Sequence, residues 1–461
     1  MAYDEYFHYG KIQLYAHQWL PFFSSVPDGS TVYGAVARDP SYLYHYLLSF
    51  PFRLFAHFVH SFTAQVVFLR LFDIGFLATG LVLFWKAFIR AGISKLVVNL
   101  TMFIMVFLPV VPFLAGQINY DNLLFMMTAL SVWLMVRLTQ EVRETRVVPA
   151  GLFLSFASVL LLGGLVKYAF LPFILGASLF WILFIHRSSR QFKIPFWRLV
   201  LPDLGTLRSV SGVFVVILFV VSFGLFSERY IGNTMLYHTP TPECDTVLGV
   251  EPCRDYDPFA RNQNYKELNL KDTVESAAKR DYPVMWGRNI MRSLFFTVGP
   301  RELQYPAGEP LKLAYIAAWI GVAAAAAALL ARGRKLWCEN SVFPLFFIAS
   351  GFYVVVLFAQ NLSDFLALGV PVAVQGRYIV LILPLLLILA ISAIRDVTRR
   401  LPHRQLVIGG IALLLAIALV FEGGGLAPFV IRSSDEWMWA GSFMQHANHV
   451  IRDVAWPLII R

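Results

Sequence analysis

The segment RSVSGVFVVILFVVSFGLFSER, residues 208–229, contains no charged residue between Arg208 and Glu228. An α-helix needs roughly 20 mostly apolar residues to cross the hydrocarbon core of a bilayer, and this segment meets that requirement. The rest of the chain is similar, because 58% of the 461 residues are hydrophobic and only 14% are charged. In soluble proteins roughly a quarter of the residues are charged. The composition therefore predicts an all-α integral membrane protein.

Ten apolar segments predict a polytopic bundle of about ten transmembrane helices. They are residues 66–89, 97–116, 120–138, 149–166, 168–185, 208–229, 312–331, 342–360, 377–394 and 405–421. Residues 41–61 are also apolar, but Pro51, Arg53 and two histidines interrupt them, which favours an interfacial helix. Within the first span, Arg70 and Asp73 lie one turn apart and are expected to pair on the helix surface.

Basic residues collect in alternate connections between these spans, as they do on the cytoplasmic side of membrane proteins. The groups are Lys86, Arg90 and Lys95; Arg137, Arg143 and Arg146; Arg187, Arg190, Lys193 and Arg198; Arg332, Arg334 and Lys335; and Arg395, Arg399, Arg400 and Arg404. Most of the net charge of +10 comes from these basic groups, which set the orientation of the protein in the membrane. We therefore do not expect nucleic-acid binding.

The alternation of basic and non-basic connections divides the chain into five regions. The expected regions are an extracytoplasmic first loop (1–65), a first transmembrane module (66–229), an outer loop (230–311), a second transmembrane module (312–421) and an outer tail (422–461). The first loop contains no apolar stretch that would act as a signal peptide. We therefore expect a further helix upstream of Met1 that carries this loop across, the alternative being a tail that translocates unaided.

Two of the three cysteines, Cys244 and Cys253, lie in the predicted outer loop. They are expected to form a disulfide in an oxidising compartment, the alternative being two free thiols. In the same loop, Tyr282, Trp286, Arg288 and Arg292 are groups that sugars could contact, or parts of a purely structural cover.

Ionisable residues also gather at the predicted outer ends of the helices, where charges near a bilayer often mark a function. They are the Asp4-Glu5 pair with His8, Asp121 in GQINYDN (116–122), Lys167 in VKY (166–168) and Arg377 in VQGRY (374–378). Two acidic and two cationic elements are typical of a reaction in which a base activates a hydroxyl and cations hold a phosphate leaving group.

An outer loop that opens with Asp-Glu, an acidic residue in the next outer turn and many membrane helices together resemble the GT-C superfamily of membrane glycosyltransferases. The stretches 116–122 and 374–378 further resemble a less characterised bacterial branch near these enzymes. The resemblance implies transfer of a sugar from a polyprenyl-phosphate carrier to a glycan, lipid or protein acceptor. It places the enzyme in the bacterial plasma membrane, in the lipid bilayer, with its active site outside.

The same resemblance implies roles for individual residues. Asp4 and Glu5 match the loop carboxylates that act as general base or orient the acceptor, and Asp121 matches the second acidic residue. His8, Lys167 and Arg377 are expected to bind substrate, the two cations at the carrier phosphate. No cofactor is required, and a divalent metal at the acidic motif is left open.

Each residue also has a structural interpretation. Asp4-Glu5 could be a solvated tail, Asp121 a helix cap, Lys167 a residue that snorkels to the interface, Arg377 an ordinary interfacial arginine and His8 an aromatic contact. The alternative functions are a transporter or lipid flippase, or a catalytically silent relative that acts as an assembly partner.

Overall fold

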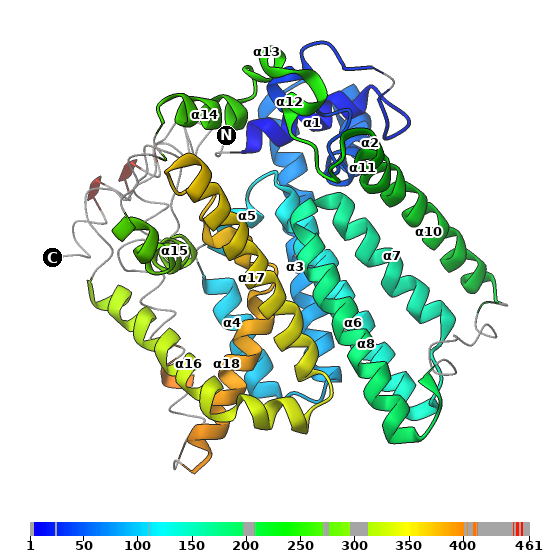
Figure 1. Cartoon of the computed structure of the whole chain (residues 1–461), viewed down its shortest axis with the longest axis vertical. Helices are drawn as coiled ribbons and strands as arrows, with labels where there is room; N and C mark the ends of the chain where they lie inside the picture. The colour runs from blue at the N-terminus through cyan, green and yellow to red at the C-terminus, as the bar shows by residue number, and fades with distance from the viewer. Residues whose placement is uncertain are drawn as a thin grey trace.

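The computed structural model describes residues 4–23, 25–108, 110–196, 207, 209–269, 271, 276–295 and 312–400, with isolated positions beyond 400. This described part of the chain is built from helices and contains no β-strand. The helices form one upright bundle with shorter segments gathered at one end (Figure 1).

The first half of the bundle contains most of the long helices. Its elements are α1 (Glu5–Ala16), η1 (Ser30–Tyr33), α2 (Leu43–Phe58), α3 (Phe62–Arg90), α4 (Lys95–Phe107), α5 (Val110–Ala115), α6 (Tyr120–Thr145), α7 (Ala150–Val166), η2 (Tyr168–Phe170) and α8 (Leu171–Phe192). Helix α6 lies at the centre and packs on α3 and α7.

The second half begins with another apolar helix and continues through a run of short ones. Its elements are α10 (Val210–Phe226), η4 (Ser227–Ile231), α11 (Gly232–Tyr237), α12 (Cys244–Leu248), α13 (Val250–Cys253), α14 (Asp257–Glu267), α15 (Ser276–Phe295), α16 (Lys312–Glu339), α17 (Phe343–Leu368), η7 (Gly376–Ile379), α18 (Leu383–Val397) and η8 (Thr398–Arg400). Helix α17 packs on α8, and α16 packs on α18.

Five helices are long and apolar enough to cross a membrane: Phe62–Arg90, Tyr120–Thr145, Tyr168–Phe192, Val210–Tyr237 and Phe343–Leu368. The predicted count of ten spans is not confirmed. Helices α4 and α7 have 13 and 17 residues, and α18 has 15. The predicted span 405–421 and the tail 422–461 lie almost entirely outside the described residues.

The predicted span 97–116 is interrupted, and proline explains why. Its sequence contains Leu108-Pro109 and then Pro112. Leu108 ends α4 in an extended conformation, with φ −66° and ψ 119°. A proline disfavours the helical conformation of the residue before it and cannot donate a backbone hydrogen bond. The segment is therefore divided into α4 and the six-residue α5.

Close helix contacts in the bundle use glycine. A Cβ atom on Gly176 of α8 would lie 2.9 Å from the Cα atom of Ala349 on α17. Small residues allow helix backbones to approach closely where both helices are apolar, as in a membrane. Gly176 therefore sets the distance between α8 and α17.

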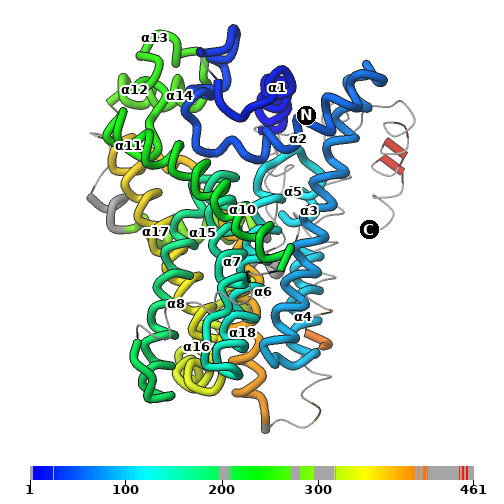
Figure 2. Tube along the Cα trace, turned by 90° about the vertical axis from the view of Figure 1, so that its right-hand side faces the viewer, coloured from blue at the N-terminus to red at the C-terminus, as the bar shows by residue number. Residues whose placement is uncertain are grey.

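The basic ends of the helices lie together at one end of the bundle. The Arg90 side chain at the end of α3 donates to Gln140 on α6, and Asn340 after α16 donates to the backbone of Ala91. The opposite end contains α1 and the α12–α14 segment, as two views at right angles show (Figures 1 and 2). Basic connections thus lie at one end of the bundle, and α1 with the α12–α14 segment lies at the other.

The α12–α14 segment contains the predicted disulfide. Cys244 and Cys253 are bonded, with their Cα atoms 5.9 Å apart, and both are buried. The prediction of a disulfide is therefore confirmed. Cys338, at the other end of the bundle, is free and exposed.

Candidate active site at one end of the bundle

Four of the predicted site residues come together from four separate segments of the chain. The Arg377 guanidinium lies 2.5 Å from the Asp4 carboxylate, and the Lys167 ammonium lies 2.6 Å from that of Asp121. Asp4 directly precedes α1, Asp121 is the second residue of α6, Lys167 lies between α7 and η2, and Arg377 belongs to η7. The fold thus makes two carboxylate–cation pairs from residues far apart in sequence.

The start of α6 leaves the Asp121 carboxylate available for this pairing. The side chain of Asn119 accepts the backbone N–H of Asp121 at 2.9 Å, so Asn119 caps the helix. Asp121 is therefore not the cap, in contrast to its structural interpretation from sequence. Its side chain instead turns towards Lys167.

Lys167 is buried and does not snorkel to the surface. The backbone of Lys167 is extended between the helical segments α7 and η2, and its side chain points inwards. The ammonium lies 4.3 Å from the centre of the Tyr120 ring and 4.8 Å from that of Tyr378. A cation over an aromatic face is attracted by the ring quadrupole, and the attraction is greater where water is excluded.

Tyr378 joins the two ion pairs into one cluster. The guanidinium carbon of Arg377 lies 5.2 Å from the Tyr378 ring, on which Lys167 also rests. Sequence reasoning did not select Tyr120 or Tyr378 as site residues. The signal was available, because each tyrosine is adjacent to a selected residue.

The side chains of the cluster become more buried from Asp4 and Arg377 to Asp121 and Lys167. The side chains of Asp4 and Arg377 are 29% and 17% exposed, whereas those of Asp121 and Lys167 are 9% and 6% exposed. Among the described residues, the Oδ2 atom of Asp121 and the Nε atom of Arg377 are buried without a hydrogen-bond partner. The site therefore offers one free acceptor and one free donor, which a substrate could satisfy.

Glu5 is fully buried and has a different set of partners from Asp4. Its two oxygens accept hydrogen bonds from Arg70 at 2.7 Å each, and Oε1 also accepts the backbone N–H of Ile118 at 3.1 Å. These bonds hold α1 against α3 and against the turn that leads into α6. Glu5 is thus placed to position the start of α1.

His8 lies beside the cluster and is linked to a second histidine. Its Nδ1 atom is 2.9 Å from Nε2 of His45, and its ring meets Tyr120 edge to face at 4.5 Å. Burial, followed by the charge of Lys11, lowers the pKa of His8 well below 6.5. Both the aromatic contact expected from sequence and a polar contact are therefore present.

The expected surface pair of Arg70 and Asp73 is wrong. Arg70 binds Glu5, and Asp73 is buried and accepts hydrogen bonds from Tyr44 at 2.9 Å and Asn122 at 3.1 Å. Arg70 and Asp73 each find a partner on a neighbouring element, and the carboxylates of Glu5 and Asp73 are both buried there. A pairing rule based on spacing along one helix cannot include such partners.

Helix α15 supports the cluster from the side. Its Ser293 hydroxyl accepts the backbone N–H of Gly376 at 2.6 Å, immediately before Arg377. Tyr282 and Trp286 of the same helix pack on α17, where Tyr282 stacks on Phe365. Tyr282 is buried in this packing, which agrees with the interpretation of a structural cover.

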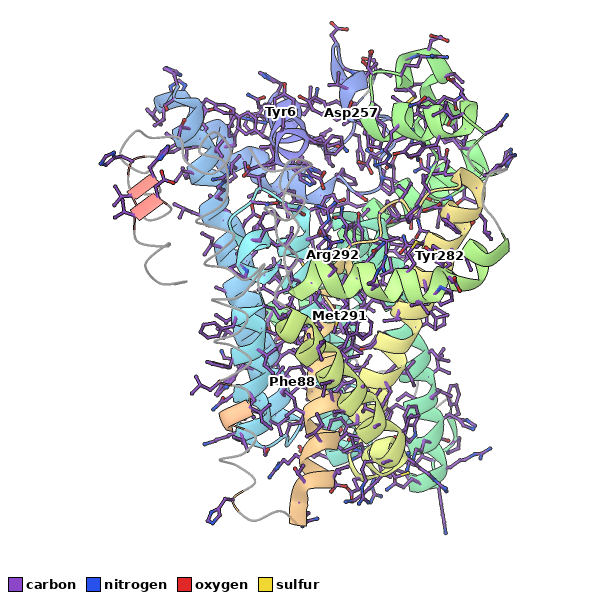
Figure 3. All side chains as sticks on the ribbon, turned by 90° about the vertical axis from the view of Figure 1, so that its left-hand side faces the viewer. Tyr6, Phe88, Asp257, Tyr282, Met291 and Arg292 are labelled. Carbon is purple, nitrogen blue, oxygen red and sulfur yellow. A yellow bond between two sulfur atoms is a disulfide. The ribbon has the colours of Figure 1, made fainter. Side chains whose placement is uncertain are left out.

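The side chains that remain accessible on α15 lie on another face. Arg288 and Arg292 are exposed. Figure 3 shows Arg292 below Tyr6 of α1 and Asp257 of α14, which lie near the end that contains the cluster.

The described residues contain no group of three or more His, Cys, Asp or Glu side chains arranged to hold a metal ion. The carboxylates of Asp4, Glu5 and Asp121 face cations instead.

No family model, curated protein or solved structure matches this chain.

Proposed function

We propose that this protein is a membrane glycosyltransferase that takes a sugar from a polyprenyl-phosphate carrier and transfers it on the outer face of a membrane. The observation that supports the proposal is the cluster of Asp4, Arg377, Asp121 and Lys167, which places two carboxylates and two cations at one end of an apolar helical bundle. The resemblance of its motifs to the GT-C superfamily supplies the reaction class.

The cations suit the phosphate of the donor. A guanidinium binds phosphate oxygens through directed N–H groups, and an ammonium provides a point charge. Arg377 is the more accessible of the two cations and has an unused Nε donor. In the proposed complex the donor phosphate lies on Arg377, while Lys167 stabilises the charge that develops as phosphate leaves.

Phosphate at Arg377 would also release the base. In the free protein the Asp4 carboxylate is held by the same guanidinium. A phosphate that takes over this guanidinium leaves the Asp4 carboxylate free to accept a proton. Donor binding thereby prepares the base for the acceptor.

The bond changes balance without a further reactant. The acceptor hydroxyl attacks the anomeric carbon, and the bond from this carbon to the phosphate oxygen breaks. The leaving phosphate takes the bonding electrons, and Asp4 takes the proton of the hydroxyl. Asp121, through its free Oδ2 atom, orients a hydroxyl of the sugar or the acceptor.

The proposed orientation follows from the charges at the other end. Basic residues at the ends of α3, α6, α8 and α16 would face the cytoplasm, as the positive-inside rule requires. The cluster would then face outside, on the side expected for use of a polyprenyl-phosphate sugar. A bacterial plasma membrane is the proposed location.

The test is transfer of radiolabelled sugar from a polyprenyl-phosphate donor in membranes that contain the protein. We expect Asp4→Asn to lower turnover by at least about 100-fold, the size of effect typical for general base catalysis. Asp121→Asn, which removes the carboxylate that orients a hydroxyl, should lower turnover as well. Asp257→Asn is the matched control, because Asp257 is an exposed carboxylate near the same end. Full turnover in both site variants would refute the assignment, and no transfer by the wild-type protein would favour a silent relative.

A further inference from the structure

A second polar site lies at the end of the bundle opposite Asp4. It is a cavity of about 280 Å³, far larger than the roughly 10–15 Å³ that a single water needs. The turn between α3 and α4 and the helices α16, α17 and α18 line it, and it is open on one side. Its lining includes Gly92, Ser94, Asn340, Ser392, Arg395, Asp396 and Arg399.

The cavity is rich in cations. Arg395 and Arg399 line it directly, and Lys335 and Arg332 reach Asp396 in its wall at 2.7 and 3.4 Å. Among the described residues, Arg395 has no carboxylate partner. Of the described residues, two carboxylates lie against these four basic side chains: Asp396, and Glu339 at 3.6 Å from Lys335. The region therefore keeps a net positive charge.

The rest of the lining offers neutral polar groups. Ser94 caps α4, so the positive end of the α4 dipole faces this region. Asn340 is fixed by hydrogen bonds to Ala91 and Val342, which holds the α3–α4 turn and the start of α17 together. A rigid polar cavity with surplus positive charge is suited to an anion.

We propose that this cavity binds a phosphate-bearing anion, either the headgroup of an anionic membrane lipid or a soluble phosphate. The elements that line it include α16 and α18, which reach the end of the bundle opposite α1 (Figure 2). Basic pockets between membrane helices are typical sites for such headgroups. The proposal does not depend on the proposed glycosyl transfer, because it uses none of the same residues.

Native mass spectrometry of the detergent-purified protein tests this site with phosphatidylglycerol as the probe. We expect wild-type protein to retain the lipid and the double variant Arg395→Gln/Arg399→Gln to bind it roughly tenfold or more weakly, as for the loss of a charge-assisted hydrogen bond. The variant Arg395→Lys/Arg399→Lys should keep part of the affinity, because it keeps the charge.

The matched control is Arg187→Gln/Arg190→Gln, which removes two exposed arginines at the end of α8 that do not line the cavity. Equal loss in the control and the cavity variant would show general charge attraction and refute the site. Inorganic phosphate distinguishes the two sources: if millimolar phosphate displaces the lipid, the site takes soluble phosphate, and if it does not, the site is specific for the lipid. Absence of binding by either probe would also refute the proposal.

Discussion

The guanidinium of Arg70 on α3 holds both carboxylate oxygens of Glu5, each at 2.7 Å, and thereby fixes the start of α1 to the bundle. Glu5 is completely buried, so its charge depends on this partner. Asp4, the preceding residue, makes its ion pair with Arg377 on a different element. Two neighbouring carboxylates thus have separate partners on different elements.

Loss of Arg70 is expected to destabilise the protein strongly. Arg70→Met leaves a buried carboxylate without its cation, which costs on the order of 3–5 kcal/mol. Arg38→Met is the comparison, because Arg38 pairs with Glu228 where both side chains are about a third exposed. An exposed pair contributes below about 1 kcal/mol. Thermal unfolding in detergent measures both, and equal effects would contradict the positioning role of Glu5.

The Asp121–Lys167 pair predicts a recovery of stability in a double variant. Lys167→Met leaves the buried Asp121 carboxylate unpaired, so we expect a clear loss of thermal stability. Adding Asp121→Asn removes this charge and should restore most of the loss. The double variant would still lack activity. If the double variant is as unstable as Lys167→Met, the ion pair does not account for the stability of this region.

Gly376 is expected to control the position of Arg377. A Cβ atom at Gly376 would lie 2.5 Å from the backbone nitrogen of Leu294 on α15, so Gly376→Ala forces these segments apart. We expect a loss of about 1–3 kcal/mol, the usual cost of overpacking, together with reduced sugar transfer.

Gly287→Ala on α15 is the control for this substitution. Among the described residues, nothing outside its own stretch of helix lies within 4 Å of the added Cβ, and alanine favours a helix over glycine by about 1 kcal/mol. The control should therefore be neutral or slightly stabilising. Equal thermal unfolding midpoints for the two variants would contradict close packing at Gly376.

The histidine pair predicts a stability that falls in acid. Burial lowers the pKa of both His8 and His45 well below 6.5, so the folded protein holds them neutral. The unfolded chain binds protons more readily as the pH falls through 6.5. Stability is therefore complete above that pH and decreases below it.

His8→Gln should reduce this acid dependence, because the amide does not titrate. His17→Gln, which changes an exposed histidine on the same segment, should leave it unchanged. Unfolding midpoints measured between pH 5 and pH 8 give the comparison. Identical profiles for wild type and His8→Gln would show that His8 is not responsible.

The disulfide predicts a redox-dependent stability of the α12–α13 segment. The bond closes a short loop of sequence separation 9, for which chain entropy gives up to roughly 2–3 kcal/mol. Cys244→Ser/Cys253→Ser should lower the thermal midpoint, whereas Cys338→Ser should not. Without reductant, alkylation followed by mass spectrometry should label Cys338 alone; labelling of all three cysteines would contradict the bond.

Several features of the protein follow from local sequence. Helix formation in residues 66–89, 120–138 and 208–229 depends on runs of apolar residues, which the sequence displays directly. Basic residues at alternate helix ends likewise predict which ends lie together. The disulfide could be anticipated because both cysteines occur in one short stretch.

Other features required the tertiary structure. The sequence suggested that Asp4, Asp121, Lys167 and Arg377 belong to one site, but only the packing of α1, α6, α7 and η7 decided which carboxylate meets which cation.

The start of α1 shows the physical reason. Side chains of successive residues at a helix start point in directions about 100° apart, so adjacent carboxylates meet different neighbours. Asp4 therefore reaches η7 and Glu5 reaches α3, although the sequence presents them as one acidic pair. Composition and spacing determined that this protein is a bundle of apolar, membrane-length helices with acidic and basic residues at the helix ends. The packing of distant helices decided which carboxylate pairs with which cation.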